Sequence, residues 1–67
     1  MNGNDFAEVE SGDKITFRVP AGINGEGTEL TGGVGEVSDG VAAVKAGAWY
    51  HIEADDFVEI VEKSAYL

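Results

Sequence analysis

Apolar and polar side chains alternate along a short segment near the middle of the first half of the chain. In residues 14–19 every second side chain is apolar, and two of the four basic residues lie between them. A period of two is typical of a strand that buries one face. Pro20 lacks a backbone N–H donor and ends such pairing. The pattern therefore predicts a half-buried strand over residues 14–19.

Four further segments are rich in β-branched and aromatic residues, which favour strands. They are residues 34–37, 41–46, 49–53 and 57–61. Asp39-Gly40 tolerates the positive φ of a tight hairpin turn between two of them. Asp55-Asp56 is predicted to form a single 3₁₀ turn before the last strand. Because no segment shows sustained helical periodicity, the sequence predicts an all-β domain without substantial helix.

The remaining segments are predicted to be irregular. Residues 21–33 contain five glycines in thirteen positions, which opposes a helix and predicts a loop. Loops of this kind often carry a binding surface. Residues 1–11 are predicted to be a loose acidic lead-in, and residues 63–67 a tail. The length of 67 residues allows one domain, with its body over residues 12–62.

The order of these elements resembles the Src-homology-3-like small β-barrels. The residues that carry the resemblance are Gly12-Asp13-Lys14-Ile15, Gly33 to Val37, Asp39-Gly40, Val41 to Ala46, Trp49 to Ile52 and Val58 to Val61. The resemblance implies a small, five-stranded, strongly bent antiparallel barrel. It implies no function, because it rests on strand lengths and turn chemistry. The chain lacks the Trp-Trp pair of the peptide-binding members, the basic residues of the RNA-binding members and the Val-Gln-Ile-Tyr motif of the plasmid reductase.

The charge of the chain favours protein partners over nucleic acid or membrane. Thirteen acidic residues against four basic ones give a net charge of −9, which repels phosphate and anionic lipid. The same charge attracts basic protein surfaces, although it also serves solubility. There is no cysteine, no secretory signal in the first residues and no long apolar run, so we expect a cytoplasmic protein.

Catalysis and metal binding each lack a required part in this sequence. The glycine-rich loop carries Glu26 and Glu29 instead of the lysine that a phosphate-binding loop needs. Glu53, Asp55 and Asp56 lack the spacing of a calcium loop. The single histidine, His51, has no nucleophile and orienting carboxylate in a suitable pattern. The sequence therefore predicts no catalytic residue, no cofactor and no metal.

The candidate partner-binding residues centre on the single tryptophan. Trp49 either covers the core or anchors an interface, and the sequence leaves both interpretations open. In the second case its strand would also expose His51, and a neighbouring strand would add Val41 and Ala43 to an apolar strip. The acidic candidates are those of the long loop and of the turn before the last strand: Glu26, Glu29, Glu53, Asp55 and Asp56.

These features predict a non-enzymatic protein-interaction module with an acidic surface. A basic protein is the expected partner, and a phage- or plasmid-encoded accessory or inhibitor protein is one form of this hypothesis. One alternative is an oligomeric barrel whose assembly forms a ligand-binding or enzymatic pore. Another is a structural assembly subunit, and self-association of the chain stays open.

Overall fold

The computed structural model describes residues 6–64, which form five β-strands and two 3₁₀ turns. The strands are β1 (Lys14–Arg18), β2 (Glu29–Ser38), β3 (Val41–Ala46), β4 (Ala48–Ile52) and β5 (Phe57–Glu62). The turns are η1 (Phe6–Glu8) and η2 (Ala54–Asp56). The predicted all-β class with five strands is confirmed. The parts of the predicted lead-in and tail at residues 1–5 and 65–67 lie outside the described residues.

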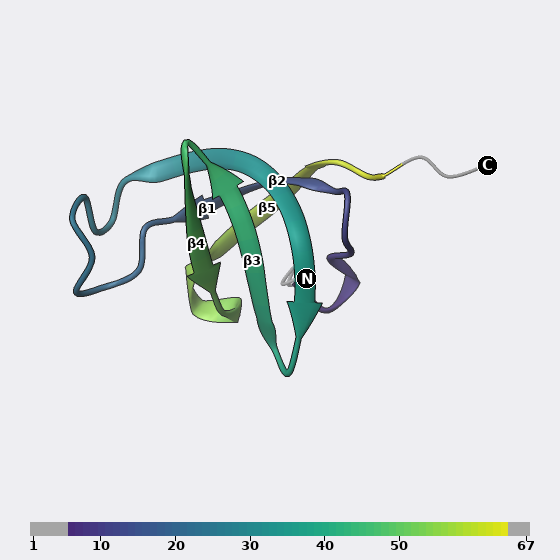
Figure 1. Cartoon of the computed structure of the whole chain (residues 1–67), viewed down its shortest axis with the longest axis horizontal. Helices are drawn as coiled ribbons and strands as arrows, with labels where there is room; N and C mark the ends of the chain where they lie inside the picture. The colour runs from purple at the N-terminus through teal and green to yellow at the C-terminus, as the bar shows by residue number, and fades with distance from the viewer. Residues whose placement is uncertain (1–5, 65–67) are drawn as a thin grey trace.

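The five strands form one antiparallel sheet in the order β4-β3-β2-β1-β5 (Figure 1). The long strand β2 bends, pairing with β1 along residues 29–33 and with β3 along residues 33–38. A register irregularity between Val34 and Glu36 interrupts the second pairing. Strands β4 and β5 are the two edges, and no pairing joins them within residues 6–64. The observed architecture is thus a single bent sheet.

Strand β2 begins earlier than the sequence predicts, because residues 29–33 belong to it and not to the loop. This half of β2 pairs with β1, with Thr31 opposite Thr16 and Leu30 opposite Phe17. Gly32 is buried there, and a methyl group on its Cα would overlap the carbonyl oxygen of Lys45. The glycine that suggested a loop therefore permits two strands to approach closely.

The turns follow the predicted chemistry. Asp39 and Gly40 have φ angles of 54° and 78° and join β2 to β3. A hairpin turn with two positive φ angles matches the right-handed twist of the strands that it connects. The 3₁₀ turn predicted around Asp55-Asp56 is confirmed as η2, which leads directly into β5.

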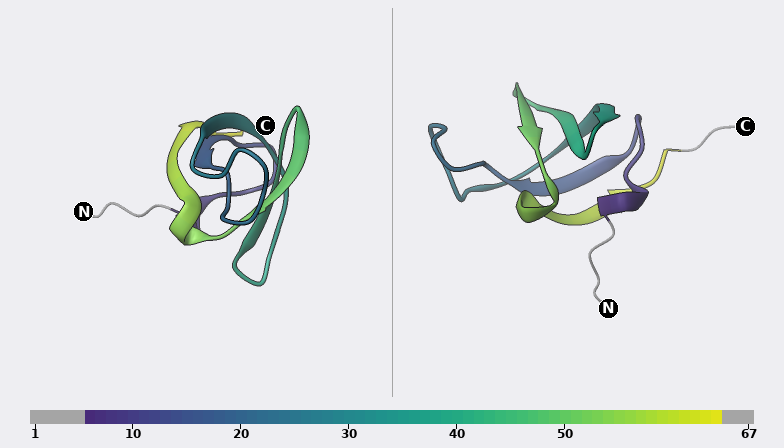
Figure 2. Two further views of the ribbon diagram at one scale, coloured as in Figure 1. Left: turned by 90° about the vertical axis from the view of Figure 1, so that its left-hand side faces the viewer. Right: turned by 90° about the horizontal axis from the view of Figure 1, so that it is seen from below.

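The core lies on the inner side of the bent sheet and includes the N-terminal segment. Its buried apolar residues are Phe6, Val9, Ile15, Phe17, Val34, Ala42, Val44 and Ile52. The ring of Phe6 contacts that of Phe57 at a centroid distance of 5.5 Å, and η1 lies beside β5 (Figure 2). The prediction of a loose lead-in is therefore wrong for residues 6–11. The side chains of Phe6 and Val9 add buried apolar surface to the core of a small domain.

Candidate functional site

The candidate interaction surface lies on the outer side of β2, β3 and β4. Tyr50 and Ile52 point toward the core, and Trp49 and His51 therefore point outward. On the neighbouring strand, Ala43 lies opposite His51. The candidates on β3 and β4 thus share one face, which we call the open face. The open face consists of Gly35, Glu36, Ser38, Val41, Ala43, Trp49 and His51.

Trp49 lies outside the core, with 54% of its surface exposed. Its indole reaches across β3 to β2, where the ring lies against Gly35. A methyl group built on Gly35 would lie only 2.7 Å from Cη2 and 2.9 Å from Cζ3 of Trp49. Glycine at this position therefore lets the indole lie close to the sheet surface.

A shallow hollow of about 240 Å³ lies on the open face, which also carries Trp49. Its lining comes from three strands: Glu36 and Ser38 of β2, Val41 and Ala43 of β3, and His51 of β4. Three of these five residues were candidates from the sequence. Glu36 and Ser38 were missed, because the strand register that places them opposite Ala43 and Val41 is a long-range property. The sequence signal that could have found them is the two-residue spacing of Glu36 and Ser38, which places both side chains on the same face of β2.

The acidic candidates do not join this hollow. Glu26 accepts a hydrogen bond from the backbone N–H of Gly22 at 3.1 Å, within the glycine-rich loop. Glu29 forms an ion pair with Arg18 at 3.8 Å. Both carboxylates therefore have partners within the chain.

The other three acidic candidates gather around the turn before β5. Glu53 precedes η2, which contains Asp55 and Asp56, and its carbonyl oxygen accepts a hydrogen bond from the N–H of Asp56 at 2.9 Å. Glu53 and Asp55 are exposed, and Asp56 is half-buried. Across residues 6–64 there is no group of three or more histidine, aspartate or glutamate residues placed to hold a metal ion.

The outer side of β1, β5 and the first half of β2 carries polar pairs between strands, and we call it the paired face. Thr16 and Thr31 share a hydrogen bond of 2.9 Å, and Lys14 lies 3.9 Å from Glu62. The Arg18–Glu29 pair completes this row. Such exposed pairs add little stability. They nevertheless pair two of the four basic residues, Lys14 and Arg18, with acidic residues of the same chain.

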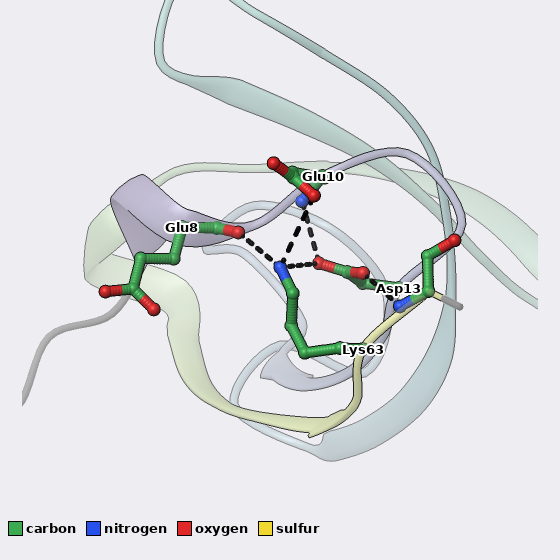
Figure 3. Close-up of polar contacts among 5 residues, drawn as sticks. Glu8, Glu10, Asp13 and Lys63 are labelled. Carbon is green, nitrogen blue, oxygen red and sulfur yellow. Dashed lines mark hydrogen bonds and ion pairs between the residues drawn. The ribbon is translucent and has the colours of Figure 1, made fainter. Parts of the chain in front are cut away.

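A buried carboxylate joins the two ends of the described chain (Figure 3). Asp13 is fully buried and accepts hydrogen bonds from Lys63 Nζ at 2.8 Å, the Ser64 N–H at 2.6 Å and the Glu10 N–H at 2.8 Å. Lys63 also donates to the carbonyl oxygen of Glu8 at 2.7 Å. We call these five residues the latch. Lys63 and Ser64, at the start of the predicted tail, are therefore held against residues 8–13.

The latch favours the charged form of both its side chains. Burial raises the pKa of the Asp13 carboxyl, but the hydrogen bonds from Lys63, Ser64 and Glu10 outweigh it and hold the pKa below its ordinary value. The hydrogen bond to Asp13 raises the pKa of Lys63, and the charges of Asp13 and Glu10 add to this against some desolvation. The latch is thus an ion pair that the fold stabilises.

The turn over residues 10–13, which carries the latch residues Glu10 and Asp13, contacts the open face at Gly35. The hydroxyl of Ser11 donates a hydrogen bond to the Gly35 carbonyl oxygen at 2.8 Å. The Gly12 N–H donates to the carbonyl oxygen of Val34, and the Val34 N–H donates to that of Asp13, each at 2.8 Å. The turn over residues 10–13 therefore fixes the irregular part of β2 on which the Trp49 ring lies.

In the part of the chain that the structure describes, no helix is long and apolar enough to cross a membrane. Comparison of the chain with protein-family models, with curated proteins and with solved structures found no match.

Proposed function

We propose that this chain is a non-enzymatic protein-interaction module that binds a basic protein through the open face. The observation that carries the proposal is the half-exposed Trp49 on the same face as a hollow with a carboxylate in its lining. Tryptophan dominates the energetic centres of protein interfaces, where its large ring loses little conformational entropy on binding. An accessory protein that covers the basic surface of another protein is one form of this function.

The charge of the chain supports a basic partner. The net charge is −9, and three of the four basic residues form ion pairs with acids of the same chain. Within residues 6–64, Glu36 has no such ion pair. A surplus of negative charge steers a positively charged surface toward the module and raises its rate of association.

We also infer that the bent sheet is an Src-homology-3-like small barrel with its seam between β4 and β5. The long bent strand β2, the Asp39-Gly40 hairpin and the one-turn segment η2 before β5 support this assignment. Nuclear Overhauser contacts between backbone protons of β4 and β5 would establish closure. A complete absence of such contacts would leave an open sheet.

The function is tested by capture on the immobilised chain from an extract of the organism that encodes it. Three baits are compared: the wild type, Trp49→Ala and the control Val61→Ala. Val61 lies on β5 and is 51% exposed, so its truncation also removes exposed apolar surface, away from the open face. We expect one protein to be retained by the wild type and by Val61→Ala but not by Trp49→Ala.

Salt supplies a second criterion. At about 1 M salt the Debye length falls to about 3 Å, so attraction between the two surfaces is screened. We expect the captured protein to elute as salt rises. Equal retention by Trp49→Ala, or retention unchanged at high salt, would contradict the proposal. A particle of several chains that captures no other protein would favour the alternative of an oligomeric barrel.

A further inference from the structure

We propose that the hollow on the open face is a binding site for one arginine side chain of the partner. This inference rests on the proposed function and specifies the group that the module recognises. The hollow holds about 240 Å³, below the 300 Å³ or more that is typical of small-molecule pockets. It is therefore suited to a single long side chain presented by a protein surface.

The lining of the hollow matches the two parts of an arginine. Val41 and Ala43 present apolar surface to the methylene groups, which favour apolar contacts while the charged end stays hydrated. Glu36 and Ser38 lie on the β2 side and offer a carboxylate and a hydroxyl oxygen. A guanidinium group carries five N–H donors in a plane and binds a carboxylate through two parallel hydrogen bonds.

Trp49 does not line the hollow, but it adds a second interaction from the same face. The tip of its indole lies against Gly35, which directly precedes Glu36 in β2. The ring and the carboxylate are therefore neighbours on the same face. A guanidinium bound to Glu36 would lie on the same face as the indole, and tryptophan is the aromatic side chain that attracts cations most strongly. Arginine benefits more than lysine, because its planar group also stacks on the ring.

Within residues 6–64, no lysine or arginine side chain lines this hollow. Lys45 is the basic residue of β3 on the outer side, but it lies opposite Trp49 in the register and does not line the hollow. Lys14, Arg18 and Lys63 are engaged in the paired face and the latch. The carboxylate of Glu36 therefore remains available to a cation from outside.

The test uses the fluorescence of Trp49, which is the single tryptophan of the chain. The full chain is titrated with a blocked peptide of the sequence Gly-Gly-Arg-Gly-Gly and with the same peptide containing citrulline, the neutral isostere of arginine. We expect a saturable change in Trp49 emission with the arginine peptide. Citrulline should bind about tenfold more weakly, because it loses charge-assisted hydrogen bonds and the cation–π attraction. A lysine peptide should fall between the two.

Two charge-neutralising variants separate local recognition from general attraction. Glu36→Gln changes the lining of the hollow, whereas Glu26→Gln makes the same change in the loop, outside the hollow. We expect Glu36→Gln to weaken arginine binding about fivefold to tenfold and Glu26→Gln to weaken it less than about twofold.

Three results would overturn the arginine site: no saturable change in emission, equal binding of the citrulline peptide, or equal weakening by the two variants. None of these results would by itself remove the proposed function, because capture of a protein that depends on Trp49 does not require arginine recognition. Conversely, if the chain binds the arginine peptide but captures no protein, the arginine site is supported and the proposed function is contradicted.

Discussion

Asp13 and Glu36 are both carboxylates of one small domain, and their surroundings are opposite. Asp13 is fully buried and receives three hydrogen bonds from its own chain, so its charge is used to hold the fold. Glu36 lies at the hollow of the open face, without an ion pair among the described residues. Charge satisfied inside the chain therefore supports stability, whereas the charge of Glu36 beside apolar surface has no partner among the described residues.

The comparison predicts that stability and binding respond to different substitutions. Changes in the latch should lower the free energy of unfolding and leave binding by the folded molecules unchanged. Changes on the open face should weaken binding and have a smaller effect on the free energy of unfolding. The turn that carries Glu10 and Asp13 contacts the open face at Gly35, whose carbonyl oxygen accepts a hydrogen bond from Ser11 and whose Cα lies under the Trp49 ring.

The largest effect on stability is expected from Asp13→Asn. The amide retains the shape of the carboxylate but loses its charge and turns an N–H₂ group toward donors. Loss of these buried bonds should lower the free energy of unfolding by about 2–3 kcal/mol, from a total of order 5 kcal/mol for so small a domain. Urea unfolding followed by circular dichroism measures this.

Asp39→Asn is the matched control for that substitution. Asp39 is exposed in the hairpin turn with a φ of 54°, a conformation that asparagine also tolerates. Its free energy of unfolding should change by less than about 0.5 kcal/mol. If Asp13→Asn were equally mild, the latch would not be a stabilising feature.

The dependence of stability on pH should follow the latch. Because the pKa of Asp13 is lowered in the folded chain, its contribution is complete above the ordinary value of 3.8 and is lost as the pH falls below it. The raised pKa of Lys63 gives a contribution that is complete below 10.5 and is lost as the pH rises above it. Urea midpoints measured from pH 2 to 12 should therefore fall less steeply at both ends in Asp13→Asn. Parallel curves for the two proteins would speak against this account.

A smaller effect on stability, with a clear effect on binding, is expected from Gly35→Ala. The added methyl group displaces the Trp49 ring, whose nearest atom would lie 2.7 Å away. We expect a shift in tryptophan emission, weaker partner binding and a loss of about 1 kcal/mol in the free energy of unfolding. Gly33→Ala is the control on the same strand, because a methyl group there meets nothing within 4 Å. An identical response of the two variants would mean that the ring position is irrelevant.

The smallest effect is expected on the paired face. Thr16→Val removes the exposed hydrogen bond with Thr31 and keeps a β-branched side chain in the strand. The free energy of unfolding should fall by about 0.5 kcal/mol, with no change in partner binding. Urea unfolding and the capture assay measure the two quantities. Loss of binding in this variant would show that the paired face contributes to recognition.

The features that could be predicted from the sequence are those with local causes. Alternation of side chains placed β1, and Asp39-Gly40 placed the hairpin, because both signals lie within a few residues. The outward direction of Trp49 and His51 was one of the two interpretations that the sequence left open, and the structure decides between them. The predictions of β1 and of the hairpin needed no knowledge of which strands are neighbours.

The features that the sequence did not reveal depend on contacts between distant residues. Asp13 and Lys63 are fifty positions apart, and nothing near either residue indicates the other. Residues 29–33 resemble a loop because of their glycines, yet Gly32 is required where β2 approaches Lys45. The hollow combines three strands, so Glu36 and Ser38 could join it only once the register between β2 and β3 was known.

The central claim is that the open face binds the partner, and one matched pair of substitutions tests it most directly. Ala43→Lys places a cation in the hollow beside Glu36, whereas Ala21→Lys adds the same charge to the exposed loop. The affinity of both folded variants for the captured protein is measured by isothermal titration calorimetry. The account predicts at least about a tenfold loss for Ala43→Lys and less than about a twofold loss for Ala21→Lys. Equal affinities would contradict it.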